Sequence, residues 1–123
     1  MPKKILVVDD KANIVLSLEI LMKQAGYDVR TASDGEEALA AIDADPPDLI
    51  LLDVNMPTKN GFEVCETVRA RNEWSHIRII MLTAHGRDIE REKGLALGAD
   101  DYLTKPFAIR EVVSKVQELL EQS

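Results

Sequence analysis

The sequence predicts one α/β domain over residues 1–123, a doubly wound sandwich of three layers in which helices cover both faces of a parallel sheet. Short, continuous apolar runs, typical of strands buried on both faces, alternate with segments of helical periodicity, so that a strand–helix unit occurs five times. Five such units are too few for a closed eight-stranded barrel, and right-handed crossovers then favour an open sheet.

The first units are marked by apolar runs and by a glycine. The run at residues 5–8 predicts a strand at about 4–9. Apolar residues at helical spacing predict a helix at about 11–25, which Gly26 ends. A second strand is expected at about 27–31.

Turn signals separate the next elements. A capping-box pattern at residues 33–36 is expected to open the second helix, which ends before Pro46. The apolar run 49–52 predicts a third strand at about 48–53. A turn-rich loop then leads to a helix at about 61–71.

The C-terminal part carries the last two units. We expect a strand at about 77–82, a helix at about 87–97 and a short strand at about 101–103. The final helix is predicted by a stripe of apolar residues at a spacing of 3.6 residues. The stripe comprises Ile109, Val112, Val113, Val116, Leu119 and Leu120.

Three further side chains carry expectations of their own. Cys65 shares a predicted helix face with apolar residues, so we interpret it as a core residue and not as a nucleophile. Trp74, in a linker, is expected to be half exposed. The helix at 87–97 offers only Ile89 for burial in its first half, so we expect it to be weakly held.

The composition excludes several classes of function. A net charge of −7 argues against direct binding to nucleic acid or to an anionic membrane. A single cysteine fits a reducing compartment. No apolar stretch is long enough to span a membrane, and the N-terminus does not resemble a signal peptide, so we expect a cytoplasmic protein.

Three acids are expected to meet at one edge of the sheet. Asp9 and Asp10 follow the first strand, and Asp53 ends the third. In the flavodoxin-like strand order 2-1-3-4-5, those two strands flank the topological switch point, where open α/β sheets bind ligands. The alternative for the Asp9–Asp10 pair alone is a helix cap with a solvated neighbour.

Oxygen ligands without a nearby His or Cys suit a hard cation, Mg²⁺ or its substitute Mn²⁺. Thr83 and Lys105 follow the fourth and fifth strands and would add a hydroxyl and an ammonium to the same edge. Such a set suits phosphoryl transfer, which requires positioning and charge neutralisation. Asp53, central among these groups, is the candidate nucleophile that would form an aspartyl phosphate.

Four motifs in this order resemble the CheY-like receiver domain of bacterial two-component response regulators, and the resemblance covers essentially the whole chain. The motifs are KILVVDD at 4–10, DLILLDVNMP at 48–57, MLTA at 81–84 and GADDYLTKPF at 98–107. The resemblance implies a phosphorelay switch in which Asp53 accepts a phosphoryl group from a phosphohistidine on a sensor histidine kinase or phosphotransfer protein. It implies no turnover of an outside substrate, only phosphorylation and dephosphorylation of the chain's own aspartate.

The resemblance also assigns metal ligands. Asp10 would bind Mg²⁺ directly and Asp9 largely through water. Asp53 would be both ligand and phosphoacceptor, and Asn55 would contribute its backbone carbonyl.

Further roles are implied for residues of the last two strands. Thr83 and Lys105 would hold the phosphoryl oxygens, and the bond before Pro106 would be cis. Tyr102 would be a switch aromatic that moves when Thr83 does. That movement would alter the surface formed by the helix at 87–97, the fifth strand and the last helix, which faces an effector or output domain.

Two other functions compete with this interpretation. A phosphohydrolase with an aspartyl intermediate usually has a second acid two residues after its nucleophile, where this chain has Asn55. A phosphorylation-independent interaction module on the same fold would usually have lost an acid, the Thr or the Lys, and none is missing here. The output, the cognate kinase, a phosphorylation-dependent homodimer and membership of a longer regulator all remain open.

Overall fold

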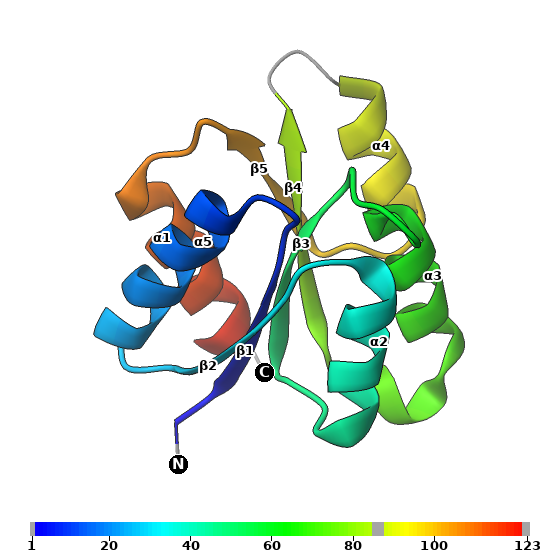
Figure 1. Cartoon of the computed structure of the whole chain (residues 1–123), viewed down its shortest axis with the longest axis horizontal. Coiled ribbons are helices and arrows are strands. Elements are labelled where there is room, and N and C mark those ends of the chain that lie inside the picture. Colours follow the sequence, from blue (N-terminus) through cyan, green and yellow to red (C-terminus); the bar gives the residue numbers. More distant parts are fainter. Residues whose placement is uncertain (1, 85–87, 122–123) are drawn as a thin grey trace.

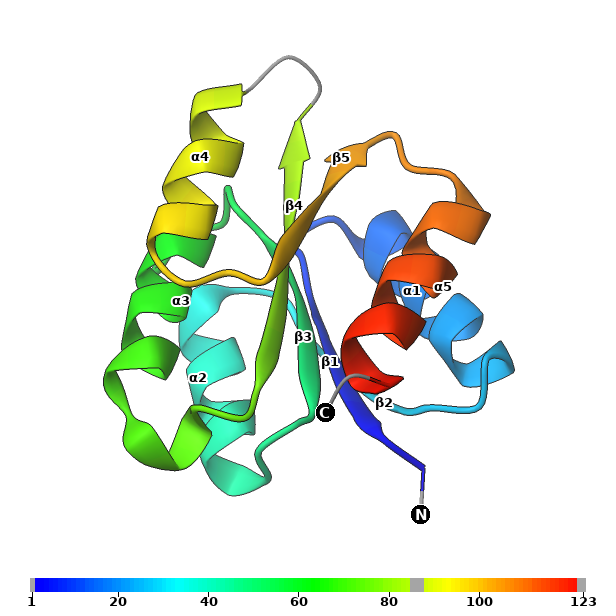
Figure 2. The same cartoon turned by 180° about the vertical axis from the view of Figure 1, so that it is seen from behind.

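The computed structural model describes residues 2–84 and 88–121, and it confirms the predicted fold. Five parallel strands form one sheet in the order β2-β1-β3-β4-β5. Helices α1 and α5 cover one face of this sheet, while α2, α3 and α4 cover the other (Figures 1 and 2). The strands are β1 Lys4–Val8, β2 Asp28–Ala32, β3 Leu49–Asp53, β4 Arg78–Ala84 and β5 Asp101–Lys105. The helices are α1 Ala12–Gln24, α2 Gly35–Ala44, α3 Gly61–Ala70, the 3₁₀ helix η1 Asn72–Trp74, α4 Asp88–Ala96 and α5 Ile109–Glu121.

Two apolar layers hold the sandwich together, one on each face of the sheet. Successive strand residues point to opposite faces, so each central strand contributes to both layers. On β3, Leu49 and Leu51 pack toward α1 and α5, while Ile50 and Leu52 pack toward α2 and α3. This burial on both sides explains why the strands are continuous apolar runs.

The last two strands are longer than predicted. β4 and β5 remain paired through Thr83 opposite Thr104 and Ala84 opposite Lys105. Thr83 and Lys105 are therefore strand residues, and not loop residues that follow the strands. Backbone hydrogen bonds to the neighbouring strand extend β4 and β5 through these polar residues. The apolar pattern of the sequence does not show where such pairing ends.

The predicted capping box at residues 33–36 is wrong by one residue. Asp34 is the N-cap of α2, and its side chain accepts a hydrogen bond from the Glu37 amide. The Glu37 carboxylate in turn accepts hydrogen bonds from the backbone amide and the hydroxyl of Ser33. Asp34 thus takes the N-cap place that we expected for Ser33, and the Glu37 carboxylate bonds to the residue before the cap instead of to the N-cap amide.

Several single-residue expectations meet different outcomes. Cys65 is buried in the core as predicted, and burial raises its pKa to about 11. The half-exposed role for Trp74 is wrong, because η1 folds its indole into the core under α3. Ile109 was predicted as part of the buried stripe but is exposed, since it begins α5 ahead of the turns that pack on the sheet.

Helix α4 buries even less apolar surface than the sequence predicted. Ile89, the expected anchor, is 80% exposed, and Gly94 is the residue of α4 that is buried. Residue 87, with which the predicted helix began, lies outside the described residues.

After the helix, Gly98 adopts a φ of 113°, a left-handed conformation that glycine permits without steric strain. Among the described helices, none combines the length and the apolar character needed to cross a bilayer.

Candidate functional site

The three predicted acids meet at the carboxyl edge of the sheet. Asp9 and Asp10 directly follow β1, and Asp53 is the last residue of the neighbouring strand β3. One carboxylate oxygen from each lies within 4.8 Å of the others. Asp9 and Asp53 are buried, whereas Asp10 faces solvent. The structure therefore brings together the acid cluster that the strand order predicted, and we call Asp9, Asp10 and Asp53 the acid cluster below.

Two lysines face the acid cluster from different elements. Lys105, at the end of β5, donates hydrogen bonds from Nζ to Asp9 Oδ2 at 2.8 Å and to Asp53 Oδ1 at 3.2 Å. Lys11, immediately before α1, places its Nζ 3.3 Å from Asp10 Oδ1 and 3.8 Å from Asp53 Oδ2. The charge of the cluster is thus neutralised in part by two ammonium groups, one from the end of β5 and one from the residue before α1.

Burial and repulsion set the protonation of Asp53. Burial and, after it, the nearby Asp9 carboxylate raise the pKa of this carboxyl to about 6, against the opposing effects of Lys105 and Lys11. For Asp10, burial acts to raise the pKa, but the hydrogen bond and charge of Lys11 outweigh it and leave that pKa lowered. Ionisation of Asp53 is therefore costly, and a further cation would relieve that cost.

One oxygen of the acid cluster is left without a hydrogen bond. Asp53 Oδ2 is buried and accepts none from the described part of the chain. A buried carboxylate oxygen without a hydrogen bond is costly, and a metal ion is one group that would satisfy it. The ligand set consists of oxygens, as Mg²⁺ and Mn²⁺ prefer, so the residues present fit such an ion.

Asn55 lies in the loop after β3, two residues beyond Asp53. Its side-chain amide approaches Glu90 Oε2 of α4 at 3.5 Å, so the side chain is turned toward α4. The expected role of the Asn55 backbone carbonyl as a metal ligand stays a prediction. The contact itself was not foreseen, because Asn55 and Glu90 are 35 residues apart.

A glycine allows the loop after β3 to close tightly over this edge. The Gly61 amide donates to the Val54 carbonyl at 2.9 Å, which brings the start of α3 against the end of β3. A Cβ at Gly61 would lie 2.3 Å from the Asp53 carbonyl oxygen, a contact with backbone that cannot yield cheaply. The loop that carries Asn55 is therefore positioned by the absence of a side chain at residue 61.

Thr83 and Tyr102 lie on the paired strands β4 and β5. Thr83 is buried one residue beyond the position that pairs with Asp53, and its hydroxyl donates to the Leu103 carbonyl at 3.5 Å. Tyr102 pairs with Met81, so its side chain and that of Thr83 project from the same face of the sheet. The Tyr102 ring is half-buried between cations of α4 and α5, Arg91 and Lys115.

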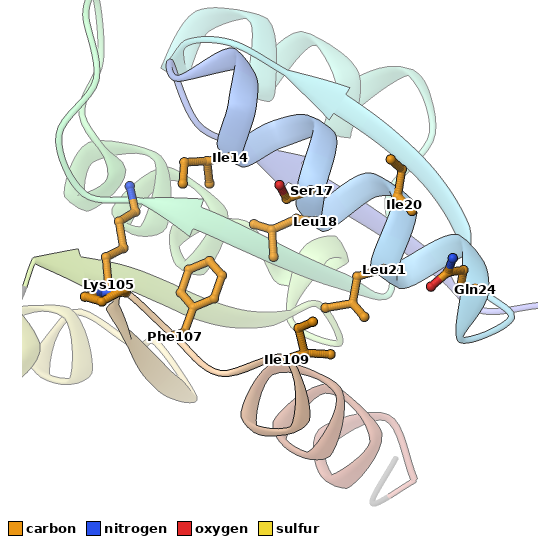
Figure 3. A pocket seen from close by; sticks show the side chains of 10 residues that line it. Ile14, Ser17, Leu18, Ile20, Leu21, Gln24, Lys105, Phe107 and Ile109 are labelled. Atoms are coloured by element: carbon orange, nitrogen blue, oxygen red, sulfur yellow. The ribbon is translucent and has the colours of Figure 1, made fainter.

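The peptide bond between Lys105 and Pro106 is cis, as the resemblance implied. The segment that follows this bond lines an apolar groove of about 520 Å³ against α1 (Figure 3). Phe107 and Ile109 face Leu18 and Leu21 across this groove, and the stem of Lys105 lines its end nearest the site. The acid cluster thus has an apolar surface beside it, from which the Lys105 ammonium reaches the carboxylates.

Sequence reasoning placed the acid cluster and Lys105 correctly but did not find all of its neighbours. The contacts of Lys11 with all three acids became evident only in the fold. Glu90 carried no signal at all, since its contact with Asn55 depends on where α4 packs.

Comparison with known proteins gives a consistent result. Residues 5–117 match the model of the response regulator receiver domain. The whole chain is 50% identical, over 123 residues, to the alkaline phosphatase synthesis transcriptional regulatory protein PhoP of Bacillus subtilis (strain 168). The chain spans half the length of that relative.

Solved structures agree with the sequence comparison. The chemotaxis response regulator CheY4 of Vibrio cholerae superposes with a TM-score of 0.90 at 36% identity, over 97% of this chain and 99% of that one. The receiver domain of NtrX from Brucella abortus gives a TM-score of 0.90 at 28% identity, again over 97% and 99% of the two chains.

Proposed function

This chain belongs to the response regulator receiver domain family, and on that premise we propose that Asp53 accepts a phosphoryl group and that the acid cluster binds the divalent cation that assists the transfer. The observation that carries the proposal is the convergence of three carboxylates within 4.8 Å, with the Lys105 ammonium hydrogen-bonded to two of them. As a receiver domain, the chain is a signalling protein of a two-component system.

The cation would be held by the acid cluster and by the backbone carbonyl of Asn55, with Asp10 as a direct ligand and Asp9 acting largely through water. Mg²⁺ fits best because it takes one or two carboxylates and keeps room for waters and a phosphate oxygen, and Mn²⁺ would substitute. Bound there, it would neutralise charge on the phosphoryl oxygens and favour the ionised form of Asp53. Asp53 Oδ2, which accepts no hydrogen bond from the described residues, supports this assignment.

The transfer needs an ionised Asp53. A carboxylate oxygen of Asp53 attacks the phosphorus of a phosphohistidine, the P–O bond forms, and the P–N bond breaks with its electron pair returning to the imidazole. Lys105, already within 3.2 Å of Asp53 Oδ1, would then pair with a phosphoryl oxygen. The phosphohistidine belongs to a partner, a sensor histidine kinase or a phosphotransfer protein.

Thr83 would convert the modification into a change of shape. Its hydroxyl, which donates to the Leu103 carbonyl, would turn to a phosphoryl oxygen and free space beside β5. Tyr102 projects from the same face and would move into that space, altering the surface formed by α4, β5 and α5. We propose that an effector or output domain reads this surface, since the chain spans half of its curated relative.

Loss of the phosphoryl group by hydrolysis would reset the switch, so the domain would act on its own aspartate and not turn over an outside substrate. A location in the cytoplasm, where kinase and Mg²⁺ are both supplied, follows from this proposal. The net charge of −7 supports an output through protein contacts rather than direct binding of this domain to nucleic acid.

The proposal is tested by incubating the protein with acetyl phosphate and Mg²⁺ and measuring intact mass. We expect one added phosphoryl group, lost in acid and prevented by EDTA. Asp53→Ala should abolish the addition, whereas the control Asp43→Ala, which removes an exposed carboxylate of α2, should not.

Unmodified wild-type protein, or labelling that survives Asp53→Ala, would contradict the assignment. A partner whose affinity does not respond to acetyl phosphate would favour the phosphorylation-independent module instead.

A further inference from the structure

Lys11 occupies a position that its own helix does not favour. It is the N-cap residue of α1, and its side chain makes no capping hydrogen bond there. The N-terminus of a helix carries partial positive charge, so a cation at this position is repelled, and the first turn of α1 contains no acid that would compensate. The reason for a lysine here lies outside the helix.

The acid cluster accounts for this lysine. Lys11 Nζ lies 3.3 Å from Asp10 Oδ1, 3.8 Å from Asp53 Oδ2 and 4.0 Å from Asp9 Oδ1. One ammonium therefore faces all three acids, including the Asp53 oxygen that accepts no hydrogen bond from the described residues. These are the same acids to which the proposed function assigns the divalent cation.

The two lysines at this edge are held differently. The Lys105 side chain is largely buried and makes two hydrogen bonds, so it is fixed among the carboxylates. The Lys11 side chain is 54% exposed and makes its one hydrogen bond to the solvent-facing Asp10. Its two contacts with buried acids are longer, so Lys11 can leave the cluster for water while Lys105 stays.

We propose that the Lys11 ammonium is a tethered counter-ion that competes with the divalent cation for the acid cluster. This inference rests on the proposed function, since it concerns the same site. In the metal-free protein, Lys11 offsets the repulsion among the three carboxylates. When the cation binds, Lys11 has to swing into solvent, so its presence weakens metal affinity and raises the metal concentration at which the switch responds.

The test compares metal affinities of the full chain by titration calorimetry with Mg²⁺ and with Mn²⁺. Lys11→Met keeps the length of the side chain and removes the charge, and Lys11→Arg keeps the charge. The matched control is Lys3→Met, which removes the same charge from an exposed residue just before β1, at the opposite end of that strand.

We expect Lys11→Met to bind Mg²⁺ about three- to tenfold more tightly than wild type, as the loss of one partly exposed cation beside three acids implies. Lys11→Arg should stay near the wild-type affinity, and Lys3→Met should remain within about twofold.

Thermal unfolding with and without metal supplies a second readout. A merely structural role of Lys11 would not make the melting difference depend on Mg²⁺. In EDTA, Lys11→Met should melt at a lower temperature than wild type, because the acids lose their counter-ion. Saturating Mg²⁺ should remove that difference, whereas loss of helix packing or of solubility would persist with metal present.

Affinity for Mg²⁺ that is the same in Lys11→Met and Lys3→Met would overturn the competition, and if acetyl phosphate still labels Asp53, the proposed function would stand. A melting difference that Mg²⁺ does not remove would overturn it equally. Absence of both Mg²⁺ binding and Asp53 labelling in every variant would instead refute the proposed function.

Discussion

The interior of the sheet and its carboxyl edge are both buried, yet they contribute to stability with opposite sign. On β3, Leu49–Leu52 have no exposed surface and pack against helices on both faces. Asp53, the next residue on the same strand, is 3% exposed and carries a carboxyl whose pKa burial raises to about 6. Within one residue, this strand thus passes from fully buried leucine, whose burial stabilises the fold, to a buried carboxyl whose ionisation destabilises it.

The difference shows that burial stabilises the apolar interior but destabilises the charged edge. Apolar burial releases water from the leucines, whereas burial of Asp53 removes water from a charge. The two lysines near Asp53 recover only part of that cost, and the Asp9 carboxylate adds to it. Under the proposed function, the site receives a cation and a phosphoryl group, and it is expected to be unfavourable before they bind.

The largest effect is expected for a substitution in the interior. Leu51→Ala should lower the free energy of unfolding by about 2–5 kcal/mol, because it removes buried methyl groups and leaves a cavity between β3 and the helices α1 and α5. Urea unfolding followed by circular dichroism measures it.

The matched control is Leu16→Ala on α1, where the side chain is 57% exposed and the expected loss stays within about 0.5 kcal/mol. Equal losses at both leucines would mean that the interior is not the source of stability.

At the edge, Asp53→Asn should stabilise the metal-free protein, by about 1–3 kcal/mol at pH 7.5. The native pKa of Asp53, about 6, exceeds its ordinary value of 3.8, so the native state binds the proton more tightly than the unfolded chain. Stability of the wild type therefore falls as the pH rises between these values, and the full cost is present above about pH 6.

The gain from Asp53→Asn should consequently shrink as the pH is lowered toward 4, in unfolding curves recorded in EDTA. Asp43→Asn, at an exposed carboxylate, should show no such pH-dependent gain. If Asp53→Asn destabilised the protein at pH 7.5 in EDTA, the edge would not differ from the interior in sign.

The smallest effect concerns the helix beside this edge. Helix α5 buries Val112, Val116 and Leu120, whereas α4 buries only Gly94 among its described residues. Ile89→Ala, at 80% exposure, should change the free energy of unfolding by less than about 0.5 kcal/mol.

Hydrogen exchange of backbone amides sharpens the contrast between the two helices. Amides of α4 should exchange faster than those of α5, because few apolar contacts resist local opening of α4. Protection of α4 equal to that of α5 would argue against α4 as the element that shifts on phosphorylation.

Much of this protein could be predicted from its sequence, because hydrophobic burial imposes a local pattern. Continuous apolar runs identified the strands, helical spacing identified the helices, and parallel strand direction placed Asp9, Asp10 and Asp53 at one edge. The errors lie where a tertiary contact overrides the local pattern. Trp74 is buried because η1 folds under α3, and Ile89 is exposed because α4 rests on the sheet through Gly94.

The sequence by itself determined the fold class and the identity of the acids, since both follow from which residues are apolar and where each apolar run ends. Only the tertiary structure decided how far β4 and β5 pair, where the Thr83 hydroxyl points and that Lys11 faces all three acids. The raised pKa of Asp53 belongs to the same group, because it depends on burial and on charges from β1, β5 and the start of α1. Those interactions join residues up to 96 positions apart, and their strength depends on distance and on exclusion of water, which no local pattern records.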